Sequence, residues 1–273
     1  MNGDVRARAA AIAPQALAAS LPTRLLRIGL TVLAVACVVQ MARDLDLAPG
    51  ALMKGVDKLG TFFGAMVPPT SGGQLPRILK ALGETFAMAF AGTVLAALAA
   101  LPLGFIGAKT IVRNEVLHFA FRRFLDLFRG VPALVWALIL VSAFGLGPFA
   151  GVVALALADV PNLAKLFSEA LENCDPKPEE GVRSAGAPPL AVMRYALAPQ
   201  VTPVMASQCL FFLEGNFRNA AVLGIVGAGG IGFELEERIR IFAFDQAAFI
   251  ILLYMACVAL LDLISRELRK RLA

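Results

Sequence analysis

The sequence predicts an all-α protein, a polytopic membrane bundle of six transmembrane helices. Composition is the first observation that predicts it. Apolar residues make up 59% of the 273 residues and charged residues only 16%, against roughly 45–50% and about 25% in ordinary globular domains. The second observation is that the apolar residues gather in runs about as long as the helices that cross a bilayer. The mean hydropathy of +0.75 agrees with both.

Six apolar runs account for the predicted spans, although the first and third are short for the roughly 20 residues that a crossing needs. In chain order they are Leu25–Met41, Gly83–Gly107, Val131–Gly147, Pro148–Phe167, Val201–Leu223 and Gln246–Ile264. We expect residues 1–82 to contain a cytoplasmic segment, the first span and an external loop with a short interfacial helix near Leu52–Phe63. Residues 83–273 then contain the other five spans and a cytoplasmic loop over residues 168–200.

Basic residues between the runs set the expected orientation. Polytopic membrane proteins keep an excess of lysine and arginine in their short cytoplasmic segments. Most of the 25 lysines and arginines fall in inside segments if the N-terminus is cytoplasmic. We therefore expect the N-terminus and the C-terminus to be cytoplasmic.

Charge and residue types exclude other classes of protein. The net charge is +5, but the basic residues form no stripe with interleaved aromatics, so we expect no nucleic-acid partner. The four cysteines and the single histidine, His118, show no metal-ligand spacing. We therefore expect no metal and no cofactor.

The glycine-rich segment VLGIVGAGGIGFEL fits the G-x-G-x-x-G pattern of dinucleotide-binding folds, and Asp245 follows as an acidic residue. That pattern needs a short strand on either side, whereas both flanking apolar runs are long enough for membrane helices. We interpret the glycines as a tight external turn, formed by Gly227, Gly229, Gly230 and Gly232. A membrane-embedded enzyme that uses this turn is the alternative.

Polar residues inside or just beyond the apolar runs are candidates for a translocation path, because charge within the bilayer is costly and is often functional. The candidates are Glu214, Asn216, Arg218, Asn219 and Asp159. Glu214 and Arg218 are spaced i, i+4 in the order that favours an ion pair on one helix face. A structural ion pair and a polar path that binds an oxyanion both remain open for them.

The cytoplasmic loop has the pattern of two short helices. Prolines break the fourth run, and a helix is predicted near Glu179, with its acids in the first turn. Gly186 and the prolines after it end this helix. A second helix, Leu190–Ala198, is predicted to stop at Pro199.

This loop resembles the motif E-A-A-x3-G-x9-I-x-L-P of bacterial ABC importer permeases. Glu180, Gly181 and Val182 occupy the E-A-A places, and Gly186 and Pro199 match the motif glycine and proline. The segment ETFAMAFAGTVLAALAALPLGFIGAK resembles the start of the transporter core in methionine- and phosphonate-type permeases. The segments RRFLDLFRGVPALVWALILVSAFGLGPFAGVVALAL and FFLEGNFRNAAVLGIVGAGGIGFEL resemble phosphonate importer permeases, and the resemblance covers the chain from Gly83 onward.

The resemblance implies a type I ABC importer permease in a bacterial inner membrane, not an enzyme. Its implied partners are a separate ABC ATPase subunit docked on the loop, a periplasmic substrate-binding protein, a second copy of the chain and membrane lipid. The chain lacks the P-loop pattern, in agreement with a separate ATPase. A proton-coupled secondary carrier using Glu214 and Asp159, and a permease for another solute such as methionine, are the alternatives.

Overall fold

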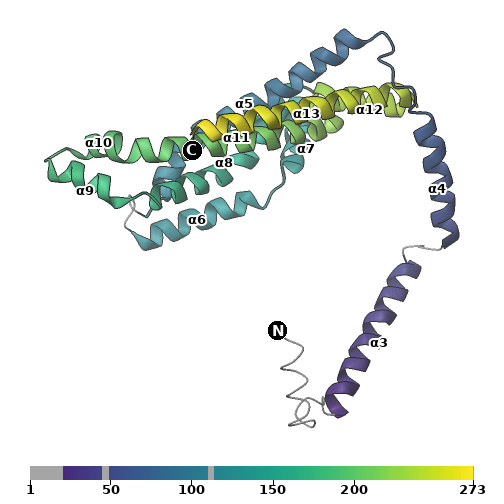
Figure 1. Cartoon of the computed structure of the whole chain (residues 1–273), viewed down its shortest axis with the longest axis horizontal. Coiled ribbons are helices and arrows are strands. Elements are labelled where there is room, and N and C mark those ends of the chain that lie inside the picture. The colour runs from purple at the N-terminus through teal and green to yellow at the C-terminus, as the bar shows by residue number, and fades with distance from the viewer. Residues whose placement is uncertain (1–20, 45–48, 110–113, 273) are drawn as a thin grey trace, which may run out of the picture. The chain divides into compact units, whose positions relative to one another are not determined.

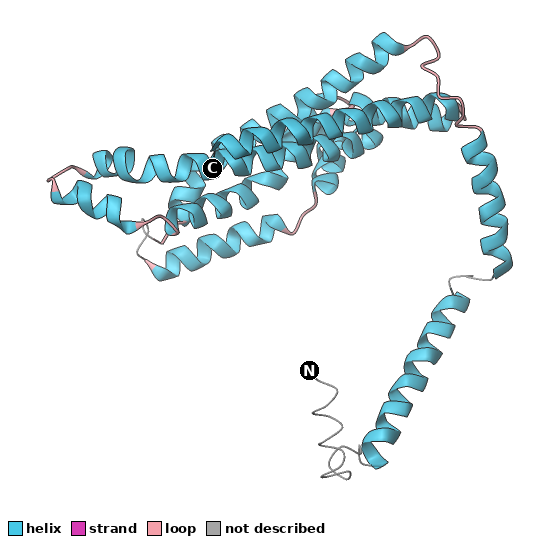
Figure 2. Ribbon diagram, in the orientation of Figure 1, coloured by secondary structure: helices cyan, strands magenta, loops and turns pink. Residues whose placement is uncertain are grey.

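The computed structural model describes residues 21–44, 49–109 and 114–272, and every regular element in these ranges is a helix (Figures 1 and 2). The chain divides between Gly64 and Ala65 into two compact units. The division expected from sequence, between residues 82 and 83, falls within a single long helix.

The first unit contains two helices. Helix α3, Leu21–Asp44, includes an apolar stretch over Leu25–Asp44 that is long enough to cross a membrane. Almost all of its described side chains are exposed, as lipid contact requires. Helix α4, Pro49–Gly64, covers the short helix predicted near Leu52–Phe63.

The second unit is a bundle built on two long helices, α5 (Leu75–Gly107) and α8 (Pro148–Glu172). Glycines allow their close approach: a Cβ atom on Gly92 would lie 2.9 Å from the Cβ of Leu155, and one on Gly104 would lie 2.7 Å from the Cβ of Phe167. Small residues at helix contacts are typical of membrane bundles, where packing supplies much of the association energy.

Helices α11 (Ala198–Leu223) and α13 (Phe244–Leu272) complete the long helices of the bundle. The Tyr254 hydroxyl on α13 donates a hydrogen bond of 3.1 Å to the Phe217 carbonyl oxygen on α11. Helices α3, α5, α8, α11 and α13 are each long and apolar enough to cross a membrane.

The third predicted span is shorter than expected. Helix α7, Ala133–Phe144, has 12 residues, fewer than a crossing needs. It meets α6 (Glu115–Arg129) at a bend of 74° near Gly130 and Pro132, and a sixth span is present only if this bent pair is counted as one. Proline cannot continue the α6 hydrogen bonding, which explains the break.

The loop region over residues 168–200 includes two short helices that project from one end of the bundle (Figure 1). Helix α9 runs over Pro176–Ser184 and α10 over Pro189–Val192. A π-helical segment η1, Met193–Leu197, then joins α10 to α11 without a break. Helix α12, Gly230–Arg240, lies at the opposite end of the bundle (Figure 1).

The prediction that a helix ends at Pro199 is wrong. In the π-helical turn before this proline the Ala198 N–H donates to the Met193 carbonyl oxygen, so the local hydrogen bonds reach back five residues. Pro199 then falls in the first turn of α11, where its missing N–H costs no helical bond. The projection is therefore continuous with a long helix of the bundle.

Candidate functional site

The projecting segment presents the residues that match the importer motif. Glu180, Gly181 and Gly186 are exposed and Val182 is half-buried, and α9 has no buried residue. Asp175 caps the helix, its carboxylate accepting a hydrogen bond of 3.1 Å from a backbone N–H of the first turn. A short helix without a buried face needs a partner surface to hold it in place.

The end of α9 turns at Gly186, whose φ of +78° lies in the left-handed region. Its N–H donates 2.9 Å to the Arg183 carbonyl oxygen. Glycine adopts this conformation without the steric cost that a Cβ would add, which explains the residue type at the motif position.

Gln200 links the projection to the bundle, and sequence reasoning missed it. From the first turn of α11 its Oε1 accepts 3.0 Å from the Asp175 N–H at the α9 cap, and its Nε2 donates 2.8 Å to the Ala196 carbonyl oxygen in η1. One side chain thus bonds the start of α9 and the segment that enters α11. The only feature of the sequence that pointed to Gln200 was its side-chain amide, directly after the motif proline Pro199.

Two of the predicted path residues meet in the interior of the bundle. The Asn216 side-chain amide donates 2.5 Å to a carboxylate oxygen of Asp159 and 2.9 Å to the Thr93 hydroxyl. All three side chains are buried, and they come from α11, α8 and α5. Buried polar groups of this kind fix the relative positions of the helices that carry them. Thr93 was missed because a lone threonine in an apolar run carries no signal.

The predicted ion pair between Glu214 and Arg218 is wrong. Glu214 is buried and accepts 2.6 Å from Arg269, whereas Arg218 is half-exposed and lies 3.3 Å from Asp262. Both partners, Arg269 and Asp262, belong to α13, which packs along this face of α11. Helix α13 therefore presents an arginine to Glu214 and an aspartate to Arg218. Asn219, the remaining candidate, is exposed.

The glycine-rich segment forms the predicted tight turn. It begins in the π-helical segment η2, Gly224–Ala228, and leads into α12, Gly230–Arg240. Gly227, Gly229 and Gly230 have φ values of +100°, +81° and +72°. At Gly232 the constraint is space, because a Cβ there would lie 1.8 Å from the Ala221 carbonyl oxygen.

Thr85 anchors this turn to α5. Its hydroxyl accepts 2.8 Å from the Ile231 N–H and donates 2.9 Å to the Ala81 carbonyl oxygen, and the side chain is fully buried. The hydroxyl thus satisfies an N–H at the start of α12 that has no partner within the helix.

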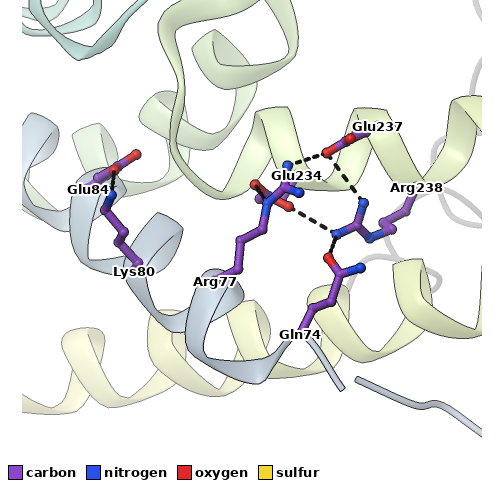
Figure 3. A network of polar contacts seen from close by, with 7 residues as sticks. All are labelled: Gln74, Arg77, Lys80, Glu84, Glu234, Glu237 and Arg238. Carbon is purple, nitrogen blue, oxygen red and sulfur yellow. Dashed lines mark hydrogen bonds and ion pairs between the residues drawn. The ribbon is translucent and has the colours of Figure 1, made fainter. Parts of the chain in front are cut away.

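A charge network joins α12 to the start of α5 (Figure 3). Arg77 lies 2.8 Å from Glu234 and 2.6 Å from Glu237. Arg238, which is buried, lies 3.3 Å from each of these carboxylates and donates to the Gln74 side chain. The network explains why α5 begins at Leu75, earlier than the predicted span that starts at Gly83. Arg77, in the first turn of α5, is paired with two carboxylates of α12.

Metal chemistry has no candidate site in the part of the chain that the structure describes, since no three or more His, Cys, Asp or Glu side chains are placed there to hold an ion. The polar groups described above instead hold helices together or stand at the surface. Polar contacts of this kind can hold helices in fixed relative positions and can pass a movement of one helix to the next.

Comparison with known proteins agrees with this geometry. The family model for the binding-protein-dependent transport system inner membrane component matches residues 100–273. The chain is 39% identical over 219 residues to the phosphite transport system permease protein PtxC of Stutzerimonas stutzeri, covering 80% of this chain and 79% of that protein. It is 34% identical over 249 residues to the phosphate-import permease protein PhnE of Mycolicibacterium smegmatis, covering 91% of this chain and 47% of that protein.

A solved structure shares the fold. The inward-facing MetNI methionine ABC transporter contains a chain that aligns with a TM-score of 0.65 at 22% identity, over 75% of this chain and all of that one. The helical bundle therefore has the fold of an ABC importer permease. The chain belongs to the family of inner membrane components of binding-protein-dependent transport systems.

Proposed function

We propose that this chain is the permease subunit of an ABC importer that moves a phosphonate or a phosphite-like anion across the bacterial inner membrane. The likeness to the phosphite permease over four fifths of both chains supports the substrate class. The observation that carries the mechanism is the exposed helix α9, bonded through Gln200 to a segment that continues into α11. The chain has no enzymatic role in this proposal.

The ATPase subunit docks on the segment formed by Glu180, Gly181, Val182 and Gly186. Helix α9 contributes no side chain to the core, so it can shift without unfolding the bundle. Because η1 runs into α11, a displacement of α9 is passed to α11 at Pro199. Helix α11 carries Asn216, so the same displacement acts on the buried Asn216–Asp159 contact.

Both termini are cytoplasmic in this proposal, which places α9 inside the cell and the turn formed by Gly227, Gly229, Gly230 and Gly232 outside. The outer turn faces the periplasmic substrate-binding protein. A second copy of the chain forms the other wall of the path, because a single bundle of this size encloses little space.

The polar residues of α11 and α8 supply the surface on which the anion moves. Arg218 is half-exposed and has donors suited to a phosphonate oxygen; Asn219 follows it on the same exposed face. Asp159, Glu214 and Asn216 are buried in the single chain. We assign them to the path as groups that become accessible when α11 moves.

The proton-coupled carrier is the weaker alternative. Family membership favours a binding-protein-dependent importer, and the Glu214 carboxylate that such a carrier would protonate is held by Arg269. Methionine is also the weaker substrate, because a probable D-methionine permease of Vibrio cholerae is 32% identical over 57% of this chain, against 39% over 80% for the phosphite permease.

Uptake by reconstituted complexes tests the proposal. The chain is placed in liposomes with its partner ATPase and substrate-binding protein, with ATP at the ATPase side. We expect ATP-dependent uptake of phosphite or methylphosphonate and none of methionine. Uptake that needs only a proton gradient, or that accepts methionine alone, contradicts the proposal. Arg218→Ala should lower the rate, and an unchanged rate removes that residue from the path.

A further inference from the structure

Helix α6 is oriented with its apolar side outward. Val116, Phe119, Phe124 and Leu127 are 79%, 62%, 56% and 73% exposed. Of the charged residues of the same helix, Arg122 and Asp126 contact Glu172 and Lys165 of α8, whereas Arg123 and Arg129 are exposed. A surface helix in water has the reverse arrangement, so the outer side of α6 is suited to contact with lipid.

A pocket of about 660 Å³ lies beneath this helix, between α6, the end of α5 and α8. Four cationic side chains line it, Lys109, Arg122, Arg123 and Lys165, against two carboxylates, Glu115 and Asp126. Asp126 is shared between Arg123 at 3.2 Å and Lys165 at 3.4 Å. With the Glu172 carboxylate that bonds Arg122 counted beside these groups, the pocket holds four cationic side chains against three carboxylates.

His118 lines the same pocket, and its Nε2 atom has no hydrogen-bond partner among the residues that the structure describes. The residue is 6% exposed. The nearest carboxylate oxygen, Oε1 of Glu172, is 3.7 Å away and already accepts from the Lys109 N–H at 2.8 Å and from Arg122 at 2.9 Å. The Arg122 Nε is likewise buried without a partner. Unsatisfied buried polar groups are costly, and both atoms belong to residues of one cationic pocket.

We propose that this pocket binds a phosphate group of an anionic ligand. A phosphate has several acceptor oxygens, which can take hydrogen bonds from the His118 imidazole, the Arg122 guanidinium and the Lys165 ammonium group. Charge-assisted bonds of this kind are the strong ones. The ligand supplies the negative charge that the lining lacks and the acceptors that His118 and Arg122 lack.

The apolar side of α6 favours a membrane phospholipid as the source of this phosphate. Cationic pockets between helices at the cytoplasmic face bind anionic headgroups, and the exposed Phe119 and Phe124 side chains offer adjacent contact for acyl chains. Helix α6 begins at the end of the bundle that carries the α9 projection (Figure 1), which is the cytoplasmic end in the orientation proposed above. Free phosphate is the other source of the same chemistry. Neither source depends on which solute is transported.

Native mass spectrometry of the purified full chain tests the proposal, with three ligands offered separately: phosphatidylglycerol, diacylglycerol with the same acyl chains, and inorganic phosphate. We expect saturable binding of phosphatidylglycerol and none of diacylglycerol. His118→Gln and Lys165→Met should each weaken phosphatidylglycerol binding about tenfold, since each removes a charge-assisted bond.

Lys80→Met is the matched control, because it removes one lysine charge from an exposed position at the far end of α5. Its binding should equal that of the unaltered chain. Thermal melting shows that each variant is folded, and Lys109→Met replaces any variant that is not. Binding of inorganic phosphate alone, lost in the same variants, assigns the pocket to a free oxyanion. Absent binding of both phosphate ligands, or equal binding in the His118 and Lys165 variants, overturns the proposal.

Discussion

Replacing Gly186 by alanine changes the turn at the end of α9 without any steric clash. The added Cβ meets no atom within 4 Å, but the residue has a φ of +78°. The whole penalty is therefore the backbone cost of a left-handed conformation, about 1–2 kcal/mol. No side chain of α9 is buried, so little opposes a change in the turn. A penalty of this size shifts the balance between turn conformations by roughly 5–30-fold.

Gly181→Ala is the matched control for this change. Gly181 lies within α9, has open space around its Cβ position and no positive φ, so alanine should stabilise the helix by about 1 kcal/mol. Alanine is also the residue that the importer motif has at this place, so the change keeps the docking segment suited to the ATPase. Gly186→Asn should be milder than Gly186→Ala, because asparagine tolerates positive φ.

The assay is substrate-stimulated ATP hydrolysis by the assembled transporter, with the amount of chain in the membrane measured in parallel. We expect Gly186→Ala to lower stimulation several-fold at an unchanged amount of protein, and Gly181→Ala to leave it intact. Equal stimulation in all three variants, or equal loss in the two alanine variants, refutes the argument from the turn.

Four further changes test separate contacts. Gln200→Ala removes the three hydrogen bonds through which this side chain joins Asp175, at the start of α9, to Ala196 in η1. It should reduce uptake with little change in melting temperature; unchanged uptake contradicts the link. Glu214→Gln should lower the free energy of unfolding by about 2 kcal/mol, a value between those for surface and buried ion pairs. In melting experiments the double variant Glu214→Gln with Arg269→Gln should lose less stability than the sum of the losses in the two single variants. Thr85→Val leaves a buried N–H unsatisfied and should cost about 1–3 kcal/mol, with Thr85→Ser restoring most of it in the same melts. Gly232→Ala places a Cβ 1.8 Å from a backbone oxygen and should abolish accumulation in the membrane, so normal accumulation on immunoblots would contradict the close packing.

Much of the fold could be predicted from composition and run length, because a membrane helix needs little beyond an apolar stretch of sufficient length. The ends of the helices were harder to predict. Helix α5 extends back to Leu75 because Arg77 is paired across the bundle with carboxylates of α12, and such a partner is invisible in the local sequence. The third span is divided because Gly130 and Pro132 end α6 before α7 begins.

The candidate site was predictable where the backbone determines the residue type. The left-handed turns at Gly186, Gly227 and Gly229 require glycine, and the sequence shows them directly. Contacts between side chains were not predictable in this way. The i, i+4 rule pairs Glu214 with Arg218 along one helix, but it does not include a neighbouring helix that carries opposite charges.

Labelling at Glu180→Cys tests the central claim, that α9 faces the cytoplasm and docks the ATPase. The other cysteines are replaced in the same chain. Among them is Cys174, for which burial and the nearby Glu179 carboxylate raise the pKa of the thiol. A membrane-impermeant maleimide should label the new cysteine in inside-out vesicles and not in right-side-out ones, and bound ATPase should protect it. Labelling from the outside, or identical labelling with and without the ATPase, would contradict the claim.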